Sequence, residues 1–341
     1  MPGEVLLDVR DLQVHFPTPD GVVKAVDGLT FQVRRGETFG IVGESGSGKS
    51  VTCLTALGLT NLERADVSGE INFKGQDLLK LNRDQLRGVR GKELSMIFQD
   101  PFACLHPFYR VGDQIVEAVL CHENVSKASA RNRTMELLSA VGIPNPKERF
   151  RDYPHQYSGG MRQRAMIAMS LVHNPDLLIA DEPTTALDVT VQAQIIELIE
   201  RVKQEFNIAV ILITHDLGVI ADTAQNIMVM YAGRSMEIGT KDDIFAQPLH
   251  PYTWGLLDSI PHLDQKGSRL VPIEGAPPSL INKPAGCPFH PRCPHRFEPC
   301  DKDRPAFEDR GGGHPEACHL KIEDKRRIWA DRQSKRTKAA V

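Results

Sequence analysis

Short, uninterrupted apolar runs alternate with amphipathic stretches over the first 240 residues of the chain. The runs at 39–42, 177–180 and 208–213 lack polar residues, which is typical of strands buried on both faces of a parallel sheet. Between the last two runs, apolar residues recur every three or four positions over 189–206, so we expect an amphipathic helix there. This alternation predicts an α/β fold with a mostly parallel sheet covered by helices.

Two segments depart from this alternation. Residues 87–170 contain helix-like stretches and loops, including a helix that Gly142 closes, and they predict an inserted helical subdomain. The last hundred or so residues are rich in Pro, His, Cys and charge, with too few apolar positions to bury a core alone. We therefore expect a main domain over 1–240 and a C-terminal extension over 241–341.

The composition of the chain disfavours several classes of protein. The chain has 341 residues, of which 44 are acidic and 41 basic, and its net charge of −3 lacks the basic excess of proteins that coat nucleic acid. No stretch approaches the roughly 18 to 20 apolar residues of a membrane span, and residues 1–10 lack a basic-then-apolar signal peptide. We expect a cytoplasmic protein without a nucleic-acid partner. The basic segment 319–341 fits either a solvated tail or contact with acidic lipid.

The segment 43–50 reads GESGSGKS and fits the pattern GxxxxGK(S/T) between an expected strand and an expected helix. Glycines let backbone N–H groups close around phosphate oxygens, and the helix N-terminus adds a partial positive charge. Lys49 is placed to reach the β- and γ-phosphates, and Ser50 to ligate Mg²⁺. The candidate ATP-binding residues here are Gly43, Glu44, Ser45, Gly46, Ser47, Gly48, Lys49, Ser50 and Val51.

Two further expected strands end in polar side chains. The run at 177–180 leads into Asp181 and Glu182, and a carboxylate pair at a strand end suits Mg²⁺ coordination and the activation of water. Alone, such a pair is also typical of a turn or a helix start. Beside a phosphate loop it favours catalysis, with Asp181 at the metal and Glu182 as the base. His215 follows the run at 208–213, so we expect it at the same edge of the sheet.

The segment 157–164 reads YSGGMRQR and begins an expected helix that Ser158 can cap. On its own this is a capped helix with a flexible start. Because it precedes the strand that ends in Asp181 and Glu182, the whole set of motifs resembles the ATP-binding cassette of ABC transporters. The resemblance implies a P-loop NTPase core with an antiparallel β edge and the inserted helical subdomain.

The resemblance also implies roles that spacing alone does not give. Gln99 stands at the glutamine loop, which senses Mg²⁺ and the attacking water, and His215 is the switch histidine that holds the γ-phosphate. Phe16 aligns with the aromatic residue that stacks on adenine. The implied contacts with a second cassette come from the signature Ser158, Gly159 and Gly160 and from the dimer loop Ala186, Leu187 and Asp188.

The sequence departs from the common family pattern at a few positions. Tyr157 stands where the signature usually has Leu, and Met161 stands where it has Gln. Phe16 is often Tyr elsewhere. Because the serine and glycines that touch phosphate remain, we expect a catalytically competent half-site.

Two segments of the tail indicate a particular group within the ABC transporter ATPases. Residues 250–253 read HPYT and residues 286–294 read GCPFHPRCP, which resembles the carboxyl extension of oligopeptide, dipeptide and nickel importer ATPases, most of all the first-named of their two ATPase subunits. The implied function is ATP hydrolysis that energises uptake of peptides, or alternatively of nickel or another small solute. The implied partners are a second ATPase subunit, identical or different, two membrane permease subunits and an extracytoplasmic solute-binding protein. The chain would lie peripherally on the cytoplasmic face of the membrane.

Four of the seven cysteines crowd the tail, without the paired CxxC spacing of common zinc ribbons. By resemblance, this pattern holds a [4Fe-4S] cluster, and four thiolates fit such a cluster. A zinc ion and unligated thiols are the alternatives, and disulfides are disfavoured by the expected compartment. The candidate ligands are Cys287, Cys293, Cys300 and Cys318.

Two other classes of protein share the cassette motifs. A soluble cassette protein that acts on ribosomes or DNA usually carries two cassettes, whereas this chain has one phosphate loop and its cysteines follow the cassette. An exporter ATPase is disfavoured by the tail. Membrane permeases that copurify with the chain would favour the importer, and ribosomes would favour the soluble class.

Overall fold

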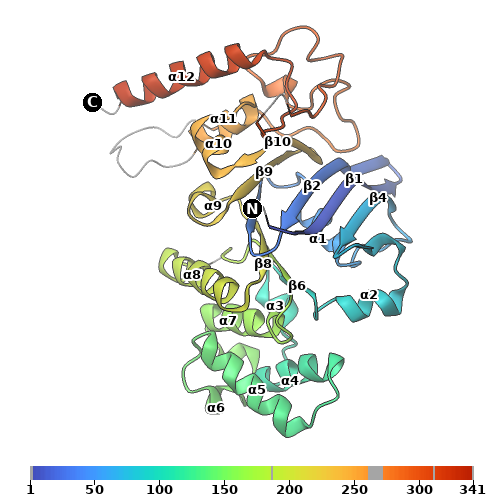
Figure 1. Ribbon diagram of the computed structural model, residues 1–341, viewed down its shortest axis with the longest axis vertical. Helices are drawn as coiled ribbons and strands as arrows, with labels where there is room; N and C mark the ends of the chain where they lie inside the picture. Colours follow the sequence, from blue (N-terminus) through green and yellow to red (C-terminus); the bar gives the residue numbers. More distant parts are fainter. Residues whose placement is uncertain (1–2, 186, 260–271, 310–311, 340–341) are drawn as a thin grey trace.

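A six-stranded sheet forms the centre of the molecule (Figure 1). The computed structural model describes residues 3–185, 187–259, 272–309 and 312–339. Neighbouring strands pair in parallel from β9 to β6, and β10 pairs antiparallel with β9. In spatial order the strands are β10 (Arg234–Thr240), β9 (Asn226–Tyr231), β3 (Thr38–Val42), β8 (Ala209–Ile213), β7 (Leu177–Asp181) and β6 (Leu94–Ile97).

The three predicted apolar runs are strands β3, β7 and β8 of this sheet, and every residue in them is buried. Strands buried on both faces need apolar side chains throughout, which explains the uninterrupted runs. Strand β6 lies within the range 87–170 that we expected to be helical. Its four residues, LSMI, are too few for a periodic pattern to separate them from a helix.

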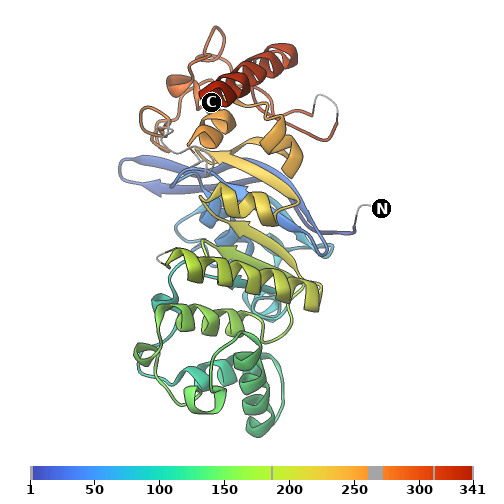
Figure 2. The same ribbon diagram turned by 90° about the vertical axis from the view of Figure 1, so that its left-hand side faces the viewer.

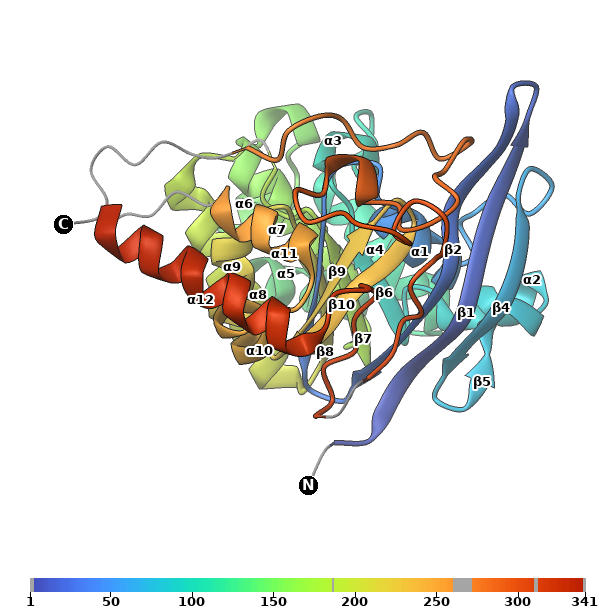
Figure 3. The ribbon, with the colours of Figure 1, turned by 90° about the horizontal axis from the view of Figure 1, so that it is seen from above.

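A second, four-stranded antiparallel sheet packs against the first. In spatial order it consists of β2 (Gly21–Arg34), β1 (Val5–Thr18), β4 (Asp66–Phe73) and β5 (Gln76–Asp77). Its inward side chains, such as Leu12, Val26 and Ile71, share one buried cluster with Ile41 and Ile213 of the central sheet. Seen from above, β1, β2 and β4 form one side of the molecule (Figure 3). The antiparallel edge that the resemblance implied is therefore present.

Helices cover the central sheet and form one end of the molecule. The predicted amphipathic helix over 189–206 is α8, which buries Ile195, Leu198 and Ile199. Gly142 has φ of 78° just beyond α5, as expected of a residue that closes a helix. The helices of the first 240 residues are α1 (Lys49–Ala56), α2 (Arg83–Val89), α3 (Pro101–Cys104), α4 (Val111–His122), α5 (Lys127–Ala140), α6 (Pro146–Arg149), α7 (Gly159–Ser170), α8 (Val189–Phe206) and α9 (Leu217–Thr223), with short 3₁₀ turns η1 (Leu78–Lys80) and η2 (Pro154–Gln156).

The extension lies at the end of the molecule opposite to helices α4, α5 and α6, with the sheets between them (Figures 1 and 2). It contains α10 (Lys241–Ala246), α11 (Pro251–Asp258), the 3₁₀ turn η3 (His290–Arg292) and α12 (Ile322–Ala339). None of the helices in the described ranges has the length and apolar character needed to span a bilayer.

The apolar core continues from the main domain into the extension. Phe289 and Trp329 of the extension belong to the same buried cluster as Val210 and Leu212 of strand β8. The extension thus completes the core of the main domain instead of building one of its own, which agrees with its low apolar content. The division after residue 240 stays a prediction from the sequence.

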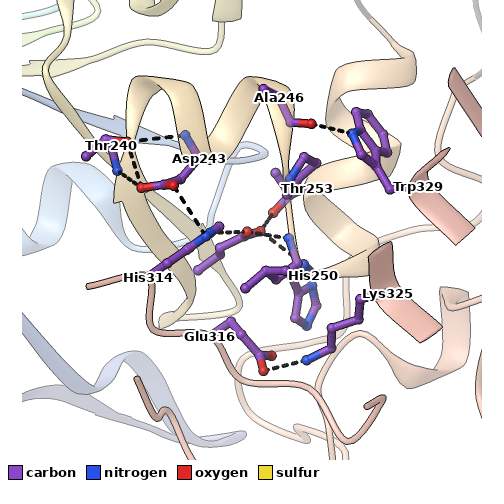
Figure 4. A network of polar contacts seen from close by, with 12 residues as sticks. Thr240, Asp243, Ala246, His250, Thr253, His314, Glu316, Lys325 and Trp329 are labelled. Carbon is purple, nitrogen blue, oxygen red and sulfur yellow. Dashed lines mark hydrogen bonds and ion pairs between the residues drawn. The ribbon is translucent and has the colours of Figure 1, made fainter. Parts of the chain in front are cut away.

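Buried polar contacts fasten the extension to strand β10 (Figure 4). Glu237 is fully buried and accepts hydrogen bonds from Thr253 and from the backbone N–H of His250, while Nε2 of His314 lies 2.7 Å from its carboxylate. Within the extension, the indole N–H of Trp329 in α12 donates to the carbonyl oxygen of Ala246 in α10 over 2.8 Å. A buried carboxylate needs such partners, because an unpaired one carries a large desolvation cost.

Candidate active site

The phosphate loop joins strand β3 to helix α1, as the sequence predicts. Gly43 has φ of 151° and Gly48 has φ of 99°, values that residues with a Cβ atom rarely adopt. A Cβ atom at Gly43 would lie 2.1 Å from the carbonyl oxygen of Met230, and one at Gly48 would lie 2.3 Å from that of Ala25. The loop therefore needs glycine at these two positions in order to fit between strand β9 and strand β2.

Lys49 lies within the loop and is only 6% exposed. Its ammonium group donates to the carbonyl oxygen of Gly43 over 2.8 Å and to that of Glu44 over 2.9 Å. Burial lowers the pKa of Lys49, and the nearby carboxylates Glu182 and Asp181 oppose this effect. The charge is thus held among the backbone groups of the loop, which would surround a bound polyphosphate.

Ser50 lies in the first turn of α1, and Asp181 is the last residue of strand β7. The hydroxyl of Ser50 donates to Oδ1 of Asp181 over 3.1 Å. Burial raises the pKa of Asp181, while the hydrogen bond from Ser50 acts in the opposite direction. Two oxygen ligands placed together next to a phosphate loop fit Mg²⁺, which binds through one or two protein oxygens and the phosphates of its nucleotide.

The three predicted catalytic residues come together at the carboxyl ends of strands β6, β7 and β8. The amide Nε2 of Gln99 donates to Oε2 of Glu182 over 3.0 Å. Nδ1 of His215 lies 3.6 Å from Oε1 of the same carboxylate, and the imidazole is mostly exposed. Glu182 has φ of 46°, and its backbone N–H donates to the carbonyl oxygen of Ile213 over 2.8 Å. This arrangement fits a reaction in which the Glu182 carboxylate activates a water molecule for attack on a γ-phosphate.

Thr185 belongs to this group, although the sequence analysis did not single it out. Its hydroxyl donates to Oε2 of Glu182 over 2.9 Å. The backbone N–H of Thr185 also donates to the carbonyl oxygen of Glu182, which closes a turn. The sequence does contain a signal for this contact, because Thr185 lies three residues after the candidate base Glu182 and a β-turn brings residues i and i+3 together.

The residues expected to serve a second cassette lie at two helix starts. Ser158 caps α7 by accepting from the N–H of Met161 over 3.3 Å, and Asp188 caps α8 by accepting from the N–H of Val191 over 3.0 Å. A Cβ atom at Gly160 would approach Val191 within 3.0 Å, whereas one at Gly159 would make an ordinary contact. The roles of the signature and the dimer loop stay predictions, and Ala186 lies outside the described residues.

Phe16 lies in strand β1, partly buried against the cluster between the two sheets. Val51 of α1 packs against the same cluster. The contacts of Phe16 and Val51 with the nucleotide stay predictions from the sequence.

The four tail cysteines line one small cavity together with His250, His290 and His295. Burial raises the pKa of Cys287 to about 11 and that of Cys318 to about 12, so these thiols are protonated at neutral pH unless a cation binds them. Within the described ranges, no three or more His, Cys, Asp or Glu side chains form a group that could hold a metal ion. The structure thus gathers the predicted ligands at one place without an arrangement that closes around a single ion.

Comparisons with known proteins agree with this geometry. A family model described as ABC transporter matches residues 26–185, and one described as oligopeptide/dipeptide transporter, C-terminal region, matches residues 236–300. The chain is 54% identical to the dipeptide transport ATP-binding protein DppD of Bacillus subtilis, over 93% of this chain and 95% of that protein. The chain belongs to the ABC transporter family. Within this family it is also 50% identical to the oligopeptide transport ATP-binding protein OppD of Salmonella typhimurium, over 95% of this chain and 96% of that protein.

Solved structures agree on the fold of this ABC cassette. The dimeric, post-hydrolysis structure of the ATP-binding cassette MJ0796 bound to ADP and phosphate matches with a TM-score of 0.62 at 23% identity, over 69% of this chain and 99% of that one. The structure of cbiO1 from Clostridium perfringens matches with a TM-score of 0.60 at 28% identity, over 72% of this chain and 92% of that one. The predicted fold class and the resemblance to ABC-type ATP-binding subunits are therefore confirmed.

Proposed function

We propose that this chain binds and hydrolyses ATP and thereby energises the uptake of dipeptides or oligopeptides through separate membrane subunits. One observation above all supports ATP hydrolysis: Gln99, Glu182 and His215 lie together at the sheet edge. They lie beside Ser50 and Asp181 at the end of the phosphate loop. The peptide substrate is supported by the relatives, which are named as dipeptide and oligopeptide transport proteins, and by the match of the extension.

The mechanism follows from the side chains at the sheet edge. Ser50, Asp181 and Gln99 would hold Mg²⁺, which when bound would supply positive charge to offset that of the nucleotide phosphates. Lys49 would bind the same phosphates, and the carboxylate of Glu182 would accept the proton of the attacking water. His215 would hold the γ-phosphate, and Gln99 and Thr185 keep the Glu182 carboxylate oriented.

A second cassette completes the proposed site. The signature Ser158, Gly159 and Gly160 would bind the nucleotide of a partner cassette, and Asp188 would contact that partner beside it. The partner's signature would in turn close on residues 43–50 of this chain. Closure of two cassettes over two nucleotides would then move two permease subunits, to which a solute-binding protein delivers the peptide. In this assembly the chain lies on the cytoplasmic face of the membrane.

The permease contact is proposed at the segment 99–106, beside the helical insert. Within it Phe102 is 62% exposed, and directly beyond it Phe108 is 81% exposed and Tyr109 is 61% exposed, a concentration of aromatic side chains that a partner would cover. Cysteine crosslinking from this segment should yield permease adducts in the assembled transporter. Adducts found only from other surfaces would refute this placement.

A [4Fe-4S] cluster is proposed for the tail. It is supported by the four thiols Cys287, Cys293, Cys300 and Cys318 at one cavity. A single zinc ion needs all its ligands around one point at about 2.3 Å, whereas a cluster takes each thiolate at a different iron atom. When bound, the cluster would supply a covalent link between segments that have little apolar surface of their own. Anaerobic purification should yield iron and acid-labile sulfide in stoichiometric amounts, and stoichiometric zinc without sulfide would exclude the cluster.

Transport can be tested in membrane vesicles that contain the chain with its permeases and second ATPase. We expect ATP-dependent uptake of a radiolabelled dipeptide or oligopeptide and copurification of the permeases. ATP-dependent uptake of nickel without peptide uptake would favour the alternative solute. Copurification with ribosomes and no permease would contradict the importer.

A further inference from the structure

Arg292 of the extension contacts the phosphate loop directly. It lies between Cys287 and Cys293, at the end of the 3₁₀ turn η3, and its side chain is 5% exposed. Nη1 donates to Oε2 of Glu44 over 2.6 Å, and Nη2 donates to Oε1 of the same carboxylate over 3.0 Å. This is a bidentate ion pair, the strongest geometry that a guanidinium and a carboxylate form.

The remaining N–H groups of Arg292 are also satisfied. Nε donates to the carbonyl oxygen of Glu274 over 2.9 Å, Nη2 to that of Ile273 over 3.1 Å, and Nη1 to the hydroxyl of Tyr231 over 3.2 Å. All five donors of the guanidinium therefore have an acceptor. A side chain bound in this way has one orientation, so the position of η3 determines where the Glu44 carboxylate is held.

The second tail motif meets the same loop residue. Tyr252, in the HPYT segment, accepts a hydrogen bond at its hydroxyl from the backbone N–H of Glu44 over 2.9 Å. Its ring lies 5.3 Å from that of Phe289, which follows Cys287 in the GCPFHPRCP segment, and 4.6 Å from that of Tyr231. Both motifs that distinguish the tail thus converge on Glu44, one at its side chain and one at its backbone.

The charge of Glu44 gives this contact a consequence for nucleotide binding. Glu44 is the second residue of the phosphate loop, and its carbonyl oxygen accepts from Lys49. A free carboxylate at this position would repel the phosphates of ATP and could move into the loop. Arg292 neutralises that carboxylate and fixes it on the side of the extension.

We infer that Arg292 is a positioning residue of the nucleotide site and that, through the pair Arg292–Glu44, the loop between Cys287 and Cys293 is coupled to the binding of ATP. The inference rests on the proposed ATPase function. It does not depend on which metal, if any, the four cysteines hold. Because coupling between two sites is reciprocal, nucleotide at the phosphate loop must also alter the stability of the cysteine loop.

The coupling can be tested first by titration of the full-length protein with a fluorescent, non-hydrolysable ATP analogue and Mg²⁺. Arg292→Gln should weaken binding about three- to tenfold, because it frees the carboxylate beside the phosphates. The affinity of Arg292→Lys should lie between those of the wild type and Arg292→Gln, because an ammonium group keeps the charge but cannot form the two-point contact. The double variant Arg292→Gln, Glu44→Gln should regain most of the lost affinity. Unchanged affinity in Arg292→Gln, or no recovery in the double variant, would overturn the inference.

The matched control is Arg332→Gln, at an ion pair with Asp258 elsewhere in the extension. We expect its nucleotide affinity to stay within about twofold of the wild type, since no part of that pair touches the phosphate loop. An equal loss in Arg332→Gln would mean that any loosening of the extension has the same effect, and it would contradict a specific contact. Failure of the wild type to bind nucleotide would instead refute the proposed function itself.

The reciprocal effect is read from backbone hydrogen–deuterium exchange, which needs no free thiol. The exchange rates of the amides of residues 287–293 are measured by mass spectrometry in the full-length protein, with and without the Mg²⁺-bound analogue. Nucleotide should slow this exchange about threefold or more when Arg292 is present, and the slowing should vanish in Arg292→Gln. Exchange that nucleotide leaves unchanged in the presence of Arg292 would overturn the coupling.

Discussion

Gln99 and Glu182 share a hydrogen bond of 3.0 Å between Nε2 and Oε2, although 83 positions separate them in the sequence. The bond joins the ends of strands β6 and β7, which pair in parallel. It orients the carboxylate that is placed to act as the base, and Thr185 donates to the same oxygen. A change at Glu182 therefore alters a carboxylate that two neighbouring side chains already hold in position.

Glu182→Gln should separate binding from hydrolysis. The amide keeps the shape of the side chain but cannot accept a proton, so we expect ATP binding close to that of the wild type. Hydrolysis should slow by roughly 10² to 10⁴, or about 3 to 5 kcal/mol in the barrier. Steady-state phosphate release and analogue titration measure the two quantities, and near-normal turnover would remove Glu182 from this role.

Lys49→Ala should act on binding itself. The ammonium group is the buried cation of the phosphate loop, and its removal leaves the β- and γ-phosphates without that partner. We expect nucleotide binding to be lost in titrations with a fluorescent ATP analogue, while the thermal melting temperature stays near that of the wild type. Tight binding in this variant would contradict the assignment.

Gly286→Ala should loosen the cysteine loop. A Cβ atom there would lie 2.3 Å from the carbonyl oxygen of Cys300, and this backbone cannot yield without moving the loop. We expect a lower melting temperature, with a cost of about 1 to 3 kcal/mol typical of overpacking. Gly88→Ala is the matched control, because a Cβ atom there meets nothing within 4 Å in helix α2, so stability should be unchanged or slightly higher. Equal melting temperatures for the two variants would contradict the packing of the loop.

Lys283 should make the free energy of unfolding increase with pH in the alkaline range. Burial lowers the pKa of Lys283 from 10.5 to about 8, although its partner Asp27 opposes the effect at 3.4 Å. Between these two values the unfolded chain binds the proton more tightly than the folded one, so the contribution of this group to stability rises with pH from about 8 to 10.5. Urea unfolding across this range should show a smaller rise in Lys283→Met. An identical slope in the variant and the wild type would refute the buried lysine as its source.

Much of this architecture could be predicted from local patterns. The helix over 189–206 and the strands around 39–42, 177–180 and 208–213 were recognisable because burial on one or both faces imposes a periodicity. The meeting of Glu182 with His215 follows from the rule that carboxyl ends of parallel strands share one edge. Gln99 was placed beside them by the family resemblance alone.

Contacts that no local pattern encodes could not be predicted. Arg292 and Glu44 are 248 positions apart, and each lies in a motif whose residues have another evident purpose. Strand β6 was missed because its four residues carry too little periodicity. The cavity that the four cysteines share is lined by residues at the start of α11 and in irregular loops of the extension, and irregular loops have no repeating pattern from which their packing could be predicted.

The continuity of the core across residue 240 has an optical consequence. The chain has two tryptophans, Trp254 and Trp329, and both belong to the extension while packing into the core shared with strand β8. Trp254 is fully buried and Trp329 is 5% exposed. Their indole N–H groups donate to the carbonyl oxygens of Pro248 and Ala246, which also belong to the extension, so water would reach both rings if the packing of the extension loosened. Because residues 1–240 contain no tryptophan, intrinsic fluorescence of the unlabelled protein therefore reports on the packing of the extension.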